Sequence, residues 1–282
     1  MTAPPGLPAY LAPACAGRVA LWRLAAGLAL TAALYVVGLA MLAAAVAALG
    51  RPGPAWALIV ALAGFAPLAL GPLLAVRVLH RRPVGSVFGP APRFCRDLVR
   101  SAWLAGLGLA AFSVLALPLG RPEAGLAPGR WAVLLVPALG AIAVQTLAEE
   151  VLFRGYLMAQ LAARFPAARW LWLGGPALLF ALLHLDRATF GSAAWAVVAV
   201  TALFGLIAAD LTLRAGNLGP AWGLHFANNV LAVLVLGMPG PIDALALWVV
   251  PVAPGAGLLA HLAANAVALA AIWAILRRAT GR

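Results

Sequence analysis

The stretch "LAAGLALTAALYVVGLAMLAAAVAAL", residues 24–49, carries no charged side chain. It is longer than the ~20 apolar residues that an α-helix needs to cross the hydrocarbon core of a bilayer. Seven further apolar segments follow, so we predict eight spans, at residues 19–49, 54–77, 102–119, 131–162, 170–185, 191–213, 220–237 and 244–276. The last is long enough to kink, and "PVAPG" at 251–255 predicts a break in it.

The amino-acid composition also indicates a membrane protein. Of the 282 residues, 65% are hydrophobic and 9% are charged, whereas soluble domains are about half apolar and about a quarter charged. The net charge of +12 comes from arginine alone, in short loops, without the contiguous basic surface of a nucleic-acid-binding protein. We therefore expect an all-α, polytopic membrane helix bundle of about eight transmembrane helices, forming a single integral membrane domain over 1–282. Its surroundings are the lipid bilayer, with no nucleic acid as partner.

The arginines predict how the chain is oriented in the membrane. If the N-terminus is cytoplasmic, fourteen arginines lie on the cytoplasmic side and four on the opposite side, in agreement with the positive-inside rule. Arg154 is left over, inside the fourth span. We expect a bacterial inner-membrane protein with both termini cytoplasmic. Cys15 and Cys95 then fall on the reducing side, so we expect no disulfide.

The fourth span contains "QTLAEEVLFRG", residues 145–155, with three ionisable groups in an apolar run. Charges inside spans cost ~2.5–3.5 kcal/mol each on insertion scales and usually face a partner or a cavity. On a helix Glu150 and Arg154 are i and i+4, at ion-pairing distance. Glu149 points about 100° away, along the face of Gln145. The spacing predicts one structural carboxylate and one that is free.

Two later spans carry further polar residues. "LLFALLHLD" places Phe180 and His184 one turn apart, and "AWGLHFANN" places His225 and Asn229 on one helical face. A lone intramembrane histidine is most often a hydrogen-bonding group in helix packing. A free glutamate, two histidines and an asparagine on three spans instead favour a hydrolytic site.

These residues carry a resemblance to a known family. "EEVLFR" matches E-E-x-x-x-R, "FALLH" matches F-x-x-x-H, and "HFANN" matches H-x-x-x-N. Together they resemble the CAAX-protease and bacteriocin-processing (CPBP or Abi) family of intramembrane proteases, which includes the Rce-type CAAX endopeptidases. The resemblance covers roughly 130–235, which we interpret as the catalytic core.

The chain also departs from the family pattern. Ala208 and Ala209 stand where small glycines are common, and Asp210 where a non-acidic residue is usual. Asp210 is expected to pair with Arg214 at i+4. The last span offers a second H-x-x-x-N, His261 and Asn265, without the preceding turn signature. We interpret this pair as a decoy or a packing pair.

The resemblance implies a mechanism. Glu149 and His184 would hold and deprotonate a water molecule, and His225 and Asn229 would donate hydrogen bonds to the developing oxyanion. The residues implied to act structurally near the site are Glu150 and Arg154, which would hold the fourth span in register, and Phe180, which would pack beside it.

The resemblance is compatible with two mechanisms, one without a cofactor and one with zinc. We favour a metal-independent glutamate mechanism with no cofactor. The alternative is a zinc enzyme, since Glu149, His184 and His225 are zinc-competent ligands. The chain has no H-E-x-x-H, which would put two ligands on one helical face.

The expected function is a CAAX prenyl protease-like intramembrane endopeptidase, acting on membrane-protein or lipid-anchored peptide substrates. Bacteria generally lack prenylated CAAX proteins, so maturation of a secreted peptide or trimming of a C-terminal sorting tail is equally plausible. Two other classes stay open. A proton-coupled transporter predicts inverted repeats, which we do not see. A non-catalytic scaffold or immunity protein would tolerate loss of Glu149. The oligomeric state does not follow from the sequence.

Overall fold

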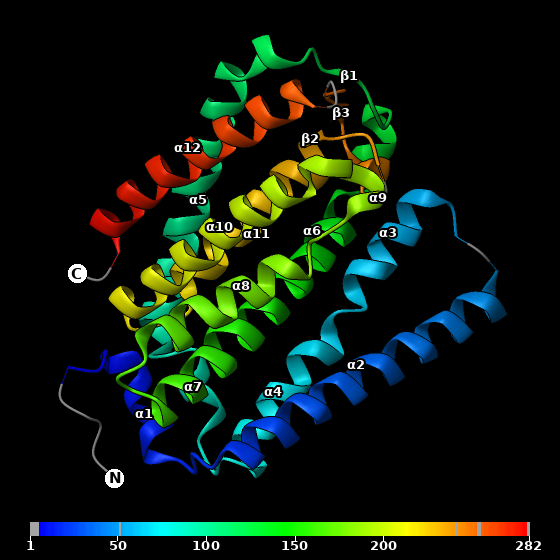
Figure 1. Cartoon of the computed structure of the whole chain (residues 1–282). Coiled ribbons are helices and arrows are strands. Elements are labelled where there is room, and N and C mark those ends of the chain that lie inside the picture. Colours follow the sequence, from blue (N-terminus) through cyan, green and yellow to red (C-terminus); the bar gives the residue numbers. More distant parts are fainter. Residues whose placement is uncertain (1–5, 51, 241, 253–254, 281–282) are drawn as a thin grey trace.

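The computed structural model describes residues 6–50, 52–240, 242–252 and 255–280, and these form a bundle of helices (Figure 1). Six described helices are long and apolar enough to span, where eight were predicted, because the predicted spans 170–185 and 220–237 are shorter. The first is the short apolar segment Trp170–Leu182, and the second is α11 (Gly219–Val230) continued by the π-helical η7 (Leu231–Val235). The prediction of a polytopic helical membrane protein is confirmed. In the described part, the helices long and apolar enough to cross a membrane are Leu21–Leu49, Pro54–Val78, Val84–Leu115, Pro128–Arg164, Arg187–Ala215 and Ala256–Ala279.

The first two spans form a flank of their own along the bundle (Figure 1). α2 (Leu21–Leu49) packs against α4 (Ala66–Val78), and the second span bends between α3 (Pro54–Ala63) and α4. Gly71 makes the close approach possible, because a Cβ there would lie 2.5 Å from the Cα of Thr31. Small residues at such crossings let helices pack closely without a hydrophobic driving force.

The central helices position the polar residues. α6 (Pro128–Glu150) continues without interruption into the π-helical η4 (Val151–Met158) and then α7 (Ala159–Arg164). Around it lie the π-helical η5 (Trp170–Gly174) with α8 (Gly175–Leu182), α10 (Ala194–Ala215) and α11, and α5 (Ala91–Leu115) packs against α11. π-helical turns inside α-helices occur frequently at functional sites. Here one begins at the residue after Glu150.

One end of the bundle is closed by short elements (Figure 1). A three-stranded sheet has the order β1 (Glu123–Ala124), β3 (Trp248–Val249), β2 (Leu236–Gly237), with β3 antiparallel to β1 and parallel to β2. Single turns complete this end: η3 (Leu117–Leu119), α9 (Arg187–Phe190), η6 (Gly191–Ala193) and η8 (Asp243–Leu245).

The sheet overturns part of one predicted span. The sequence predicted a helix from 244, but 243–250 forms η8 and β3, and α12 (Ala256–Ala279) begins only at Ala256. The reason is the proline- and glycine-containing stretch 251–255, where the break was predicted, of which residues 253 and 254 lie outside the described residues.

The opposite end carries η1 (Ala9–Leu11), α1 (Ala12–Ala16) and η2 (Val84–Val87). The imidazole of His80 is buried there, with Nδ1 2.7 Å from the carbonyl oxygen of Arg18 and Nε2 3.0 Å from the hydroxyl of Tyr156. α1 and the last turn of α12 lie at this same end (Figure 1). Both cysteines are free, as predicted: Cys15 is buried and Cys95 is exposed.

Candidate active site

A buried ion pair lies at the junction of α6 and η4. Arg154 Nη1 donates to Glu150 Oε1 at 2.9 Å, and the two residues are 2% and 0% exposed. Arg154 Nη2 donates to the carbonyl oxygen of Gly205 on α10 at 3.2 Å. The predicted pairing of Glu150 with Arg154 is therefore confirmed. It also ties two spans together, which the spacing alone did not indicate.

His225 on α11 stands between the two adjacent glutamates. Its Nδ1 lies 2.8 Å from Glu150 Oε1, and its Nε2 lies 3.4 Å from Glu149 Oε2. Because an ionised carboxylate only accepts hydrogen bonds, the short contact assigns a proton to Nδ1. The longer contact exceeds ordinary hydrogen-bond length. Nε2 and the Glu149 carboxylate therefore face each other without being bonded.

Glu149 differs from its neighbour in its bonding. It is 7% exposed, and its Oε2 is buried without a hydrogen-bond partner among the described residues. Glu150 accepts two hydrogen bonds through one oxygen, whereas no hydrogen bond to Glu149 occurs in the described part of the chain. The prediction of one paired and one free carboxylate is confirmed as geometry. A buried polar group in this state calls for water or a ligand.

Asn229 lies one turn after His225 and is fixed by α6. Its Nδ2 donates to Gln145 Oε1 at 2.8 Å. Close by, Trp222 Nε1 donates to Thr146 Oγ1 at 3.1 Å. These two bonds join α11 to α6 on either side of His225. Helical spacing indicated only that Gln145 lies on the same face as Glu149. Its role as the partner of Asn229 was missed, as were Trp222 and Thr146.

Aromatic rings enclose the histidines on the α8 side. The Phe180 ring centroid lies 5.9 Å from that of His225 and 4.7 Å from that of His184. The Arg154 guanidinium carbon lies 5.0 Å from the same ring centroid. Phe180 thus packs beside the site, as predicted. Phe204 on α10, with its centroid 5.0 Å from that of His225, was not anticipated.

His184 follows the last turn of α8 and is exposed. Its Nδ1 donates to the carbonyl oxygen of Phe180 at 2.8 Å, because a carbonyl oxygen only accepts. Nε2 is then free to accept a hydrogen bond in the neutral ring. His184 and His225 flank one phenylalanine, but no direct contact between His184 and Glu149 occurs within the described residues.

A zinc site built from Glu149, His184 and His225 is not assembled. Among the residues that the structure describes, no three His, Cys, Asp or Glu side chains gather closely enough to hold a metal ion.

The structure also shows the surroundings of Asp210 and of the His261–Asn265 pair. Asp210 pairs with Arg214 at 3.2 Å, as predicted, and also with Arg277 at 3.3 Å and with the indole N–H of Trp273 at 2.9 Å, which links α10 to α12. His261 and Asn265 line a cavity.

The sequence and structure were compared with known protein families, proteins and solved structures. Residues 130–231 match the family model described as "Type II CAAX prenyl endopeptidase Rce1-like", and this confirms the resemblance seen in the three motifs. The uncharacterized protein YyaK of Bacillus subtilis (strain 168) is 26% identical over 179 residues, which are 59% of this chain and 56% of that protein. The chain thus spans little more than half the length of that relative. No solved structure matches.

Proposed function

We propose that the chain is an intramembrane endopeptidase in which Glu149 activates a water molecule. The observation that carries the proposal is the bonding of the two adjacent glutamates. Glu150 is held by Arg154 and His225, and Glu149 keeps a buried oxygen without a protein partner beside the same imidazole. Both glutamates and His225 lie within the residues that match the Rce1-like family.

The hydrolysis balances with this chain's own groups. Glu149 takes a proton from water, the resulting hydroxide adds to the scissile carbonyl, and the proton passes to the leaving amine as the C–N bond breaks. The free Nε2 of His184 is suited to accept the second hydrogen of that water. No step passes through a metal ion.

Two groups are available to stabilise the oxyanion. Asn229 uses one N–H on Gln145 and retains a second for the substrate oxygen. Nε2 of His225 faces Glu149 and is a donor while it holds the proton that Glu149 took from water, before that proton passes to the leaving amine. Fixed donors in a water-poor site are worth more than in water, because they need no reorganisation as charge develops.

The depth of the site supports a membrane-embedded substrate. Glu149 lies fifteen residues before Arg164, where its helix ends, or about 20 Å along the axis at ~1.5 Å per residue. The hydrocarbon core is about 30 Å thick, so a helix that leaves it near Arg164 would keep the carboxylate inside it. We propose a membrane-protein or lipid-anchored peptide as substrate, and a bacterial inner-membrane location with both termini cytoplasmic.

The test compares the termini of membrane proteins in cells carrying the wild-type chain or Glu149→Gln. Removal of a general base typically lowers a rate by ~10²–10⁴. The termini that cleavage creates in wild-type cells should therefore be absent from cells with Glu149→Gln. Thermal stability should be nearly unchanged, since Glu149 accepts no hydrogen bond from the described residues. The same substitution at exposed Glu123 on β1 is the matched control and should leave cleavage intact. Wild-type cleavage by Glu149→Gln would refute the proposal.

A further inference from the structure

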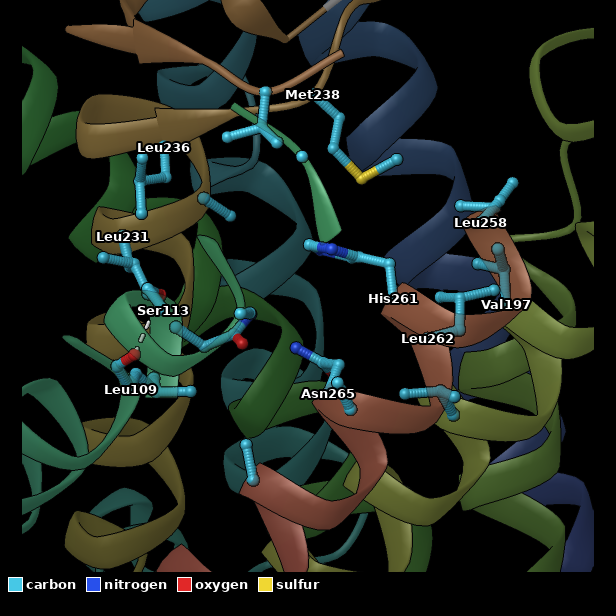
Figure 2. A pocket seen from close by; sticks show the side chains of 18 of the residues that line it. Leu109, Ser113, Val197, Leu231, Leu236, Met238, Leu258, His261, Leu262 and Asn265 are labelled. Atoms are coloured by element: carbon cyan, nitrogen blue, oxygen red, sulfur yellow. Dashed lines mark hydrogen bonds between the residues drawn. The ribbon is translucent and has the colours of Figure 1, made fainter. Parts of the chain in front are cut away.

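A cavity of about 380 Å³ lies away from the glutamates, between α5, α10, η7 and α12, beneath the segment that follows η7 (Figure 2). Most of its wall is apolar. It is built mainly from aliphatic and aromatic side chains, such as Leu109, Phe112, Val200, Leu231, Met238 and Leu258. Ligand pockets have volumes of ~300–1,000 Å³ and are mostly apolar with a few polar groups. The size and character of this cavity fit that description.

A small set of polar side chains faces the same hollow. Figure 2 shows His261 and Asn265, one turn apart on α12, both directed into it. Neither side chain makes a hydrogen bond to another of the described residues, whereas Asn229 is bonded to Gln145. An unsatisfied polar group within a span is costly. The hydrogen-bonding groups of the pair are therefore available to an occupant.

The wall of the cavity carries no formal charge. No Asp, Glu or Arg is among the described residues that line it, and its polar groups are amide, imidazole and hydroxyl groups. An ionised carboxylate or phosphate would find no countercharge there, and unpaired charges within the apolar part of a membrane protein are costly. The volume also excludes a transmembrane helix, whose diameter with side chains is ~10–12 Å. The fitting ligand is small and neutral, with one hydrogen-bonding end.

We propose that this cavity binds a neutral single-chain amphiphile, with its hydroxyl, amide or ester end at His261 and Asn265 and its chain along the apolar wall. The site is separate from the proposed hydrolysis. The cavity also touches the α11 amides, because Asn228 lines it and donates to Asn229 Oδ1 at 3.1 Å. A bound polar end can therefore reach a neighbour of the Asn229–Gln145 bond.

The test is photo-crosslinking of the full chain in nanodiscs. One probe is a long-chain fatty alcohol with a diazirine in its chain, and the other is the corresponding fatty acid at a pH where it is ionised. We expect saturable labelling of α12 and η7 by the alcohol, displaced by unlabelled alcohol, and at least fivefold weaker labelling by the acid. Equal labelling by both probes, or labelling that does not saturate, would overturn the proposal.

Variants on α12 distinguish binding of the probe in the cavity from its general contact with the lipid-facing surface. Ala264 lines the cavity, and Ala263, the preceding residue, is exposed on the helix surface. Ala264→Phe should abolish the saturable labelling, and Ala263→Phe should retain it. Asn265→Leu keeps the side-chain volume but removes the amide, and should lower labelling at least fivefold; it decides the question if Ala264→Phe fails to fold. Labelling that is unaffected by Asn265→Leu would count against the site as described.

Discussion

Replacing Arg154 with methionine tests the framework of the candidate active site. The guanidinium is 2% exposed and has three neighbours: the Glu150 carboxylate, the Gly205 carbonyl oxygen and the Phe180 ring. Methionine fills similar space but leaves a fully buried carboxylate whose remaining partner among the described residues is His225. The variant thus isolates the energetic consequence of an unpaired charge.

The magnitude follows from burial. Breaking a buried ion pair by removing one partner destabilises a protein by ~3–5 kcal/mol, because the other charge stays desolvated. Loss of the hydrogen bond to Gly205 adds about 1 kcal/mol. For a chain of this size each kcal/mol shifts the Tm by roughly 2–4 °C, so a drop on the order of 10 °C is expected. Removing both charges should be milder, because no carboxylate is then stranded.

The assay is thermal unfolding in detergent, followed by tryptophan fluorescence. Glu150→Gln combined with Arg154→Met should be more stable than Arg154→Met alone. Arg214→Met is the control, since the Arg214–Asp210 pair is partly exposed and Asp210 keeps Arg277 and Trp273. That control should cost no more than ~1 kcal/mol. If Arg154→Met costs no more than the control, the buried pair does not hold the site together.

Three further predictions concern other parts of the molecule. Burial lowers the pKa of His80, which lies just beyond the second span. The stability that the neutral imidazole contributes is therefore complete above the unfolded-state pKa of about 6.5, and it is lost as the pH falls toward the lowered pKa of the folded state. The Tm should fall between pH 7.5 and 5.5, and it should fall less in His80→Gln. A Cβ on Gly223 would lie 2.5 Å from the Leu98 carbonyl oxygen, so Gly223→Ala should push α11 from α5 and lower both Tm and cleavage, whereas Gly106→Ala, whose Cβ would meet nothing nearer than 4.0 Å, should be neutral. Exposed Cys95 should react with a membrane-impermeant maleimide only after the cells are opened; labelling of intact cells would reverse the proposed orientation.

Local features of the site followed from the sequence because they depend on one helix. The Glu150–Arg154 pair is an i, i+4 relation, and so is Asp210–Arg214. The position of Glu149 about 100° away follows from the same geometry. The fold class followed from apolar length, since only helices and closed barrels satisfy the backbone in lipid.

Relations between helices could not be predicted in this way. Helices that face lipid and helices that face protein are both apolar, so the hydrophobic pattern does not show which spans are neighbours. The Asn229–Gln145 bond and the contact of Arg154 with Gly205 join different spans. The π-helical η4 and the small sheet depend likewise on tertiary contacts, and the sequence has no local signal for them.

Polar residues within the spans supply the information that the apolar pattern lacks. Because a polar group in hydrocarbon must be satisfied, each one requires a partner, a cavity or a ligand. Arg154 and Glu150 have protein partners in the structure and therefore serve the framework. Among the described residues, Glu149 accepts no hydrogen bond, and His261 and Asn265 make none. Their requirement has to be met by something other than the chain, which is why we place a reacting water at Glu149 and a ligand in the α12 cavity.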